Sequence, residues 1–148
     1  IGYFSYNAYI MLLGSSSAKK NYEQYWIYDL EAGIAQAKSE NKKVLVDCTA
    51  SWCSLCKNVD KKFFSNILFW NKTADHVVAV KLDCSNMDDL QTQSFLEEYN
   101  IKGLPAILIL DPNTLEVWGQ FDSRVCNWDV IMFASSIIDV CSDSEDKN

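Results

Sequence analysis

Apolar residues along this chain occur either in short continuous runs or at intervals of three and four. Runs rich in β-branched residues are typical of buried strands, and three such runs lie at residues 44–46, 77–82 and 106–110. Apolar residues at helical spacing predict the helices, which we place at residues 29–41, from about 53 to 64, at 67–73, from 89 onward and at 127–141. The side chains expected to face inward include Leu55, Val59 and Phe63 in the second helix, and Leu90, Phe95 and Leu96 in the fourth.

The order of these elements indicates the fold class. Helix and strand alternate through the first half of the chain; residues 111–113 then form a turn, and residues 115–121 return as an antiparallel strand. This order predicts an α/β fold, with a central mixed sheet of four or more strands flanked by helices. We find no repeat or internal linker, and expect one domain at 29–141, an N-terminal extension at 1–28 and an acidic tail at 142–148.

The N-terminal extension has an unusual charge pattern. Its first eighteen residues carry no charge, and Lys19 and Lys20 follow them. This pattern fits the end of a transmembrane helix, the end of an export signal, or sequence foreign to the protein. It also fits a strand or arm that packs on the domain. We expect export or membrane tethering, with the chain cut from something longer.

Composition limits the classes of function. The chain has 148 residues, of which 49% are apolar, with only 5 Gly and 2 Pro, so it can bury one substantial core and is not disordered. The formal net charge of −7 repels phosphate backbones and anionic lipids, so we expect no nucleic-acid partner. A single histidine, His76, makes histidine-based chemistry hard to assemble, which leaves the 6 cysteines as the candidate chemical groups.

Only two of these cysteines, Cys53 and Cys56, have an informative spacing, C-x-x-C. The others are scattered singly along the chain: Cys48, Cys84, Cys126 and Cys141. We interpret Cys48 and Cys141 as small buried apolar residues. A structural disulfide between Cys84 and Cys126 remains open.

A C-x-x-C that opens a helix directly after a buried strand is typical of a redox site. Residues three apart lie on one side of a helix, so the two sulfurs can close a disulfide with little backbone movement. The helix N-terminus favours the thiolate of Cys53, which we expect to be the exposed nucleophile. Cys56 is expected to be buried and to act as the resolving thiol, with Trp52 forming an apolar lip for a substrate. The alternative is half of a zinc site, but the chain has no second close pair of ligands, so we expect no metal.

Two segments resemble the thioredoxin superfamily. Residues 44–57, Val-Leu-Val-Asp-Cys-Thr-Ala-Ser-Trp-Cys-Ser-Leu-Cys-Lys, are similar to its active-site segment, and Gly103-Leu104-Pro105 is similar to its cis-proline loop. The resemblance covers about residues 29–141, and it is strongest to the C-terminal thioredoxin domain of the bacterial DsbD family of thiol–disulfide interchange proteins. It implies the thioredoxin fold and electron transfer through the Cys53–Cys56 disulfide with no other cofactor. It also implies that Pro105 is cis and that the Leu104 backbone pairs with a bound substrate.

The same resemblance assigns roles to two acids. Asp47 matches the family's buried acid, a proton carrier for the resolving thiol, and Asp60 lies where DsbD-type domains carry a second acid. An ordinary solvated position on the helix is the alternative for Asp60. The dipeptide between the cysteines, Ser54-Leu55, is neither the Gly-Pro of thioredoxin nor a histidine-containing pair. Buried acids and a missing imidazolium both disfavour the Cys53 thiolate, and they therefore favour a reductant.

These observations lead to one main hypothesis and two alternatives. The main hypothesis is a monomeric protein-disulfide reductase that is extracytoplasmic, in the periplasm, and tethered to the inner membrane. Its partners would be protein thiols and disulfides, including an adjacent membrane electron-transfer domain. One alternative is a non-catalytic metal-binding or copper-delivery module of the same fold. The other is a disulfide isomerase or a lumenal thioredoxin of a secretory pathway.

Overall fold

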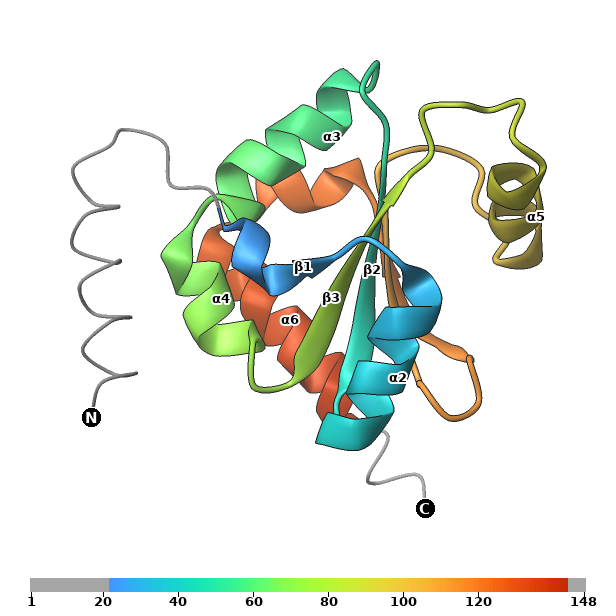
Figure 1. Cartoon of the computed structure of the whole chain (residues 1–148). Coiled ribbons are helices and arrows are strands. Elements are labelled where there is room, and N and C mark those ends of the chain that lie inside the picture. The colour runs from blue at the N-terminus through green and yellow to red at the C-terminus, as the bar shows by residue number, and fades with distance from the viewer. Residues whose placement is uncertain (1–21, 144–148) are drawn as a thin grey trace, which may run out of the picture.

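A computed structural model of the chain describes residues 22–143, and its centre is one five-stranded sheet (Figure 1). The strand order is β1-β3-β2-β4-β5. The first three strands run parallel, whereas β4 is antiparallel to β2 and β5 is antiparallel to β4. The strands are β1 (Trp26–Ile27), β2 (Lys43–Thr49), β3 (Val77–Asp83), β4 (Ala106–Leu110) and β5 (Val117–Phe121). The predicted α/β class with a mixed sheet of four or more strands is thus confirmed.

Helices cover both faces of this sheet. In Figure 1, α3, α4 and α6 lie on one side, and α2 and α5 lie on the other. The α-helices are α2 (Leu30–Glu40), α3 (Ser54–Val59), α4 (Ile67–Thr73), α5 (Leu90–Glu98) and α6 (Val130–Asp143). The shorter turns are η1 (Glu23–Tyr25), η2 (Asp60–Phe64), which continues α3 as a π-helix, and η3 (Ser123–Asn127).

Three local predictions are wrong. Leu55 and Leu90 are 47% and 76% exposed: each lies in the first turn of its helix, and the residues that α3 and α5 bury come later in each helix. The last helix begins at Val130 rather than at 127, because the Asp122 side chain caps a separate 3-10 turn by accepting a hydrogen bond from the Arg124 N–H. The two-residue strand β1, in the segment predicted as extension, was not expected.

Alternation along the strands divides the core into two layers. On β2, Leu45 packs against a mainly aromatic layer under α3, α4 and α6, whereas Val44 and Val46 pack against an aliphatic layer under α2 and α5. The next two residues continue this alternation. Asp47 therefore shares the face of Leu45, and Cys48 shares the face of Val46.

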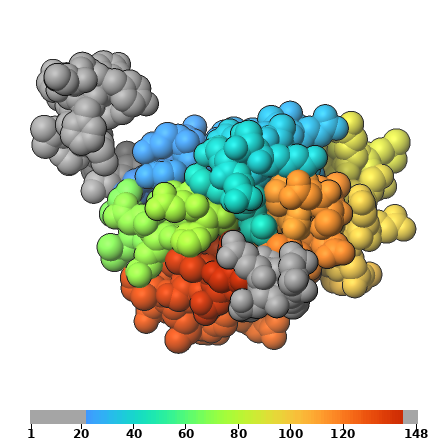
Figure 2. Space-filling model, turned by 90° about the horizontal axis from the view of Figure 1, so that it is seen from below, coloured from blue at the N-terminus to red at the C-terminus, as the bar shows by residue number. Residues whose placement is uncertain are grey.

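The carboxyl end of β2 leads into α3 at one end of the molecule (Figure 1). Figure 2 views the molecule from below, where the surfaces of α2, α4 and α6 meet.

Most of the predicted N-terminal extension and residues 144–148 lie outside the described residues. Between residues 22 and 143, no helix combines the length and the apolarity that crossing a membrane requires.

Candidate active site

Cys53 and Cys56 are joined by a disulfide where β2 leads into α3. Their Cα atoms are 5.3 Å apart, and the sulfur of Cys53 caps the helix by accepting a hydrogen bond from the Cys56 N–H at 3.1 Å. The sequence predicts an exposed Cys53, but Cys53 is only 6% exposed and Cys56 only 2%. Cys53 is thus the slightly more exposed of two buried residues, and Ala50 and Leu104 pack against the pair.

The segment before β4 contributes one of these contacts. Leu104 packs against the small cluster formed by Ala50, Cys53 and Cys56. The peptide bond between Leu104 and Pro105 is cis, and Pro105 is buried. An open pocket of about 450 Å³ runs from this loop towards β5. The disulfide thus adjoins a backbone segment that lies at the edge of a groove.

Trp52 directly precedes Cys53 and is 58% exposed. Its indole N–H donates to the carbonyl of Ser85 at 2.9 Å, and the N–H of Ser51 donates to the Ser85 hydroxyl oxygen at 2.8 Å. The Ser85 hydroxyl in turn donates to Asp83. The segment after β3 therefore holds the active-site turn in place. Sequence reasoning missed Ser85 and Asp83, although the Asp-x-Ser spacing is typical of such a turn.

Asp47 lies on β2 beneath this turn and is 1% exposed. One of its carboxylate oxygens, Oδ2, has no hydrogen-bond partner. Burial raises the pKa of Asp47 to about 7, with a smaller contribution from the negative charge of Asp60, while the positive charge of Lys81 opposes the rise. The carboxyl group can therefore hold or release a proton near neutral pH.

Asp60 and Lys81 connect this buried acid to the surface. Lys81 is paired with Asp47 in the β2–β3 register, and its Nζ lies 3.7 Å from Oδ1 of Asp60. Burial raises the pKa of Asp60, and the charge of Lys81 opposes this effect. Lys81 also lies over the ring of Trp26, and these residues line a pocket of about 170 Å³. Sequence reasoning missed Lys81; its signal is a lysine that interrupts the apolar run at residues 77–82.

Three further cysteines lie outside the active-site disulfide. Cys48 and Cys84 are buried and Cys126 is half-buried, and none of the three is in a disulfide. The bridge between Cys84 and Cys126 that the sequence left open is therefore absent. Over the part of the chain that the structure describes, no three or more His, Cys, Asp and Glu side chains are grouped so that they could hold a metal ion.

Sequence comparison gives two findings. Residues 25–112 match a family described as thioredoxin-like. The chain is also 28% identical over 109 residues to the thiol:disulfide interchange protein DsbD of Actinobacillus pleuropneumoniae, an alignment that covers 70% of this chain and 18% of that relative. The chain thus spans less than a fifth of the length of this curated relative.

Two solved structures show the same fold. A thioredoxin from Thermus thermophilus superposes with a TM-score of 0.64 at 21% identity, covering 79% of this chain and 86% of the other. The oxidised C-terminal domain of DsbD from Neisseria meningitidis superposes with a TM-score of 0.54 at 17% identity, covering 66% and 86%. The thioredoxin fold predicted from the sequence is therefore confirmed.

Proposed function

Because the chain belongs to the thioredoxin-like family, we propose that its Cys53–Cys56 pair exchanges electrons with the disulfides of other proteins. One observation carries this proposal: two cysteines close a disulfide beside a cis-proline loop and an exposed tryptophan. Such a pair can be oxidised and reduced reversibly while the sheet and helices around it stay in place.

The exchange proceeds in two steps. The Cys53 thiolate attacks one sulfur of a partner's disulfide, which forms a mixed disulfide and releases the partner's other sulfur as a thiolate. The Cys56 sulfur then attacks Cys53, which closes the Cys53–Cys56 disulfide and releases the second partner sulfur. The domain loses two electrons, and the partner's disulfide is reduced to two thiols. Cys53 is proposed to act first because it is the more exposed residue of the two and lies at the N-terminus of α3, which favours its thiolate.

Asp47 is proposed to take the proton that Cys56 gives up in the second step. Its support is a carboxyl group of pKa about 7 that is buried on the strand leading into the cysteine turn, with one oxygen unpaired. Asp60 and Lys81, which line a pocket, would pass this proton to the solvent. Asp60 would also tune the pKa of Asp47, because its charge raises it.

The direction of electron flow is proposed to be out of the domain. The disulfide form carries no charge, whereas the reduced form places a Cys53 thiolate near acids that disfavour a further negative charge. The residues between the cysteines, Ser54 and Leu55, offer no cation to offset this effect. Both features destabilise the reduced form relative to the disulfide, as expected of an electron donor.

The partner is proposed to bind as an extended segment across Trp52 and the Leu104 backbone. Trp52 presents an exposed ring that the Ser85 carbonyl holds in place. Leu104 contacts the disulfide cluster and also borders the open pocket next to Pro105. A segment laid across these residues would bring its own disulfide to Cys53.

The cellular setting follows from the similarity to DsbD. We propose a domain of a larger interchange protein that faces the periplasm, is tethered to the inner membrane and receives electrons from an adjacent membrane domain. Its support is the alignment to a thiol:disulfide interchange protein, of which this chain spans 18%. Measured reduction of the Cys53–Cys56 disulfide by the neighbouring domain of the same protein would test it, and no electron transfer between the two would contradict it.

A trapping experiment tests the order of attack. The reduced Cys56→Ser variant should form a mixed disulfide with a disulfide-bonded protein such as insulin, visible on a non-reducing gel and removed by dithiothreitol. The matched Cys53→Ser variant should form at least about ten-fold less, because the one cysteine of the pair that it keeps, Cys56, is the less exposed of the two. Equal trapping by both variants, or none by either, would contradict the proposal.

A further inference from the structure

A second pair of cysteines, Cys48 and Cys84, lies outside the site described above. Cys48 is on β2, and Cys84 directly follows the end of β3. Both are buried in the aliphatic layer under α2 and α5, and neither is in a disulfide. The proposed exchange reaction uses neither of them.

The sheet register brings the two sulfurs together. Cys48 is paired with Leu82, and the N–H of Cys84 donates to the carbonyl of Thr49 at 2.7 Å, so the two chains remain paired beyond β3. Because side chains alternate along paired strands, Cys48, Leu82 and Cys84 share one face. Each thiol shifts the pKa of the other, and both belong to the same cluster of buried residues. The two side chains are therefore neighbours, although 36 positions separate them in the sequence.

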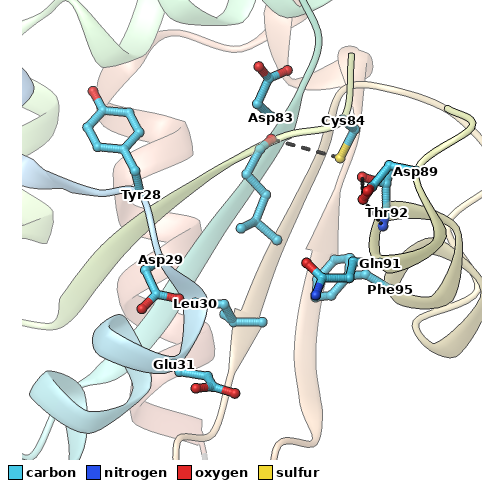
Figure 3. A pocket seen from close by; sticks show the side chains of 11 residues that line it. Tyr28, Asp29, Leu30, Glu31, Asp83, Cys84, Asp89, Gln91, Thr92 and Phe95 are labelled. Carbon is cyan, nitrogen blue, oxygen red and sulfur yellow. Dashed lines mark hydrogen bonds between the residues drawn. The ribbon is translucent and has the colours of Figure 1, made fainter. Parts of the chain in front are cut away.

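Cys84 lines a pocket of which Cys48 is not a lining residue. The pocket has a volume of about 630 Å³ and lies between the end of β3, the start of α2, and α5. Figure 3 shows the Cys84 sulfur near Asp89 and Thr92 at the start of α5, with Gln91 and Phe95 of the same helix below them. The sulfur lies 3.8 Å from the carbonyl of Leu82. A small molecule that enters this pocket thus meets Cys84 first.

The charges around the pocket select against anions. Four of its lining residues are acidic, and none is basic: Asp29, Glu31, Asp83 and Asp89. An anionic oxidant such as oxidised glutathione is repelled by these carboxylates, whereas an uncharged hydroperoxide is not.

The two thiols are unequal. Their mutual interaction lowers the pKa of Cys84, although burial and the negative charge of Asp83 oppose this effect, and it raises the pKa of Cys48, as does burial. Cys84 is therefore the better nucleophile, and Cys48 keeps its proton until a second step.

We propose that Cys48 and Cys84 form a second redox centre, which small uncharged hydroperoxides oxidise to a disulfide through this pocket. The Cys84 thiolate attacks the peroxide, so that an S–O bond forms and the O–O bond breaks; the departing oxygen takes up a proton to become water or an alcohol. The Cys48 sulfur then attacks the sulfenic acid on Cys84. The S–S bond forms, the S–O bond breaks, and the hydroxide that leaves combines with the Cys48 proton to form water. Two thiols lose two electrons, which the peroxide accepts.

The test uses the full chain with Cys53→Ser and Cys56→Ser, so that it is independent of the proposed exchange reaction. The protein is treated with hydrogen peroxide, alkylated, and digested with trypsin without reduction. Cleavage after lysine and arginine leaves Cys48 on peptide 44–57, Cys84 on peptide 82–102, and the other two cysteines together on peptide 125–147. We expect a disulfide-linked pair of peptides 44–57 and 82–102. Two unlinked peptides whose cysteines are still thiols would overturn the proposal.

Two matched variants in this background separate the roles. Cys48→Ala should leave a sulfenic acid on Cys84 that dimedone traps. Cys84→Ala should slow oxidation of Cys48 at least about ten-fold, because the accessible nucleophile is gone. Oxidation of Cys48 at an unchanged rate in Cys84→Ala, or of Cys84 without linkage when Cys48 is present, would overturn the proposal.

Discussion

At the scale of single residues, the buried carboxyl group of Asp47 destabilises the folded state, and the same group is proposed to take up a proton in the reaction. It is buried on a central strand with an unpaired oxygen, which proteins tolerate at few positions. Its charged form is destabilised in the folded state and is solvated in the unfolded chain. The free energy of unfolding is therefore lower at any pH where the carboxyl group of the unfolded chain is ionised.

The sign of this pH dependence follows from the raised pKa. Folding raises the pKa of Asp47 from 3.8 to about 7, so between these values the native state binds more protons than the unfolded chain. The free energy of unfolding consequently falls as the pH rises through this window, by roughly 4 kcal/mol from this group alone. Asp47→Asn should remove this loss. The free energy of unfolding of the variant should therefore rise relative to that of the wild type as the pH is raised from about 4 to about 9.

Urea denaturation of the oxidised protein at both pH values measures this gain. Asp29→Asn is a suitable control, because Asp29 is exposed and precedes α2. If the free energies of unfolding of Asp47→Asn and the wild type differ by the same amount at both pH values, the prediction is contradicted. The same variant should also slow resolution of the mixed disulfide by Cys56, if Asp47 takes up the proton of Cys56.

At the scale of elements, α2 lies unusually close to the sheet. Gly33 is buried in this helix, and a methyl group added to its Cα would collide with Cγ2 of Val80 on β3. Glycine is therefore needed here for close approach, although it lowers intrinsic helix stability by about 1 kcal/mol. Asn41 ends the same helix with a φ of 56°, a left-handed conformation that asparagine tolerates well.

Gly33→Ala should consequently destabilise the protein by about 1–3 kcal/mol, although alanine favours helix formation. Val80→Ala removes the colliding atom, so the double variant should be more stable than the sum of the two single effects by at least about 0.5 kcal/mol. Urea denaturation of the four proteins of this cycle measures the coupling. Additive effects would show that α2 shifts away from the sheet without cost.

At the scale of the whole molecule, an aromatic layer joins the element that carries the cysteines to the rest of the fold. Phe133 of α6 contacts Phe63, which continues the cysteine-bearing helix, at a ring-centroid distance of 4.7 Å. It also contacts Phe69 of α4 and Phe121 of β5. The closing helix thus holds the position of the active-site helix over the sheet.

Phe133→Ala should lower the free energy of unfolding by about 3–5 kcal/mol, because Phe133 is fully buried and its loss leaves a cavity. Leu90→Ala is the matched control: Leu90 is 76% exposed, so its loss should cost less than about 0.5 kcal/mol. Thermal and urea denaturation distinguish the two variants. Comparable losses in the two variants would contradict the prediction that the aromatic layer contributes more to stability than an exposed side chain does.

The local pattern of the sequence was sufficient for most elements. β4 was predicted with its observed bounds and α4 likewise, because each is a compact run bounded by turn residues. The pair Cys53 and Cys56 was also found locally, since its spacing alone places two sulfurs on one side of a helix. The strand β1 was missed because two residues are too short to show a period.

The sequence by itself determined the redox pair and the order of helices and strands, because both depend on contacts within a few residues. Only the tertiary structure decided which distant groups meet. It buried Asp47 near Lys81, and it placed Leu104 against the disulfide. It also brought Cys84 beside Cys48, although each reads as an isolated cysteine in the sequence. The physical reason is that strand pairing sets these neighbours, and pairing depends on register across the sheet rather than on spacing along the chain.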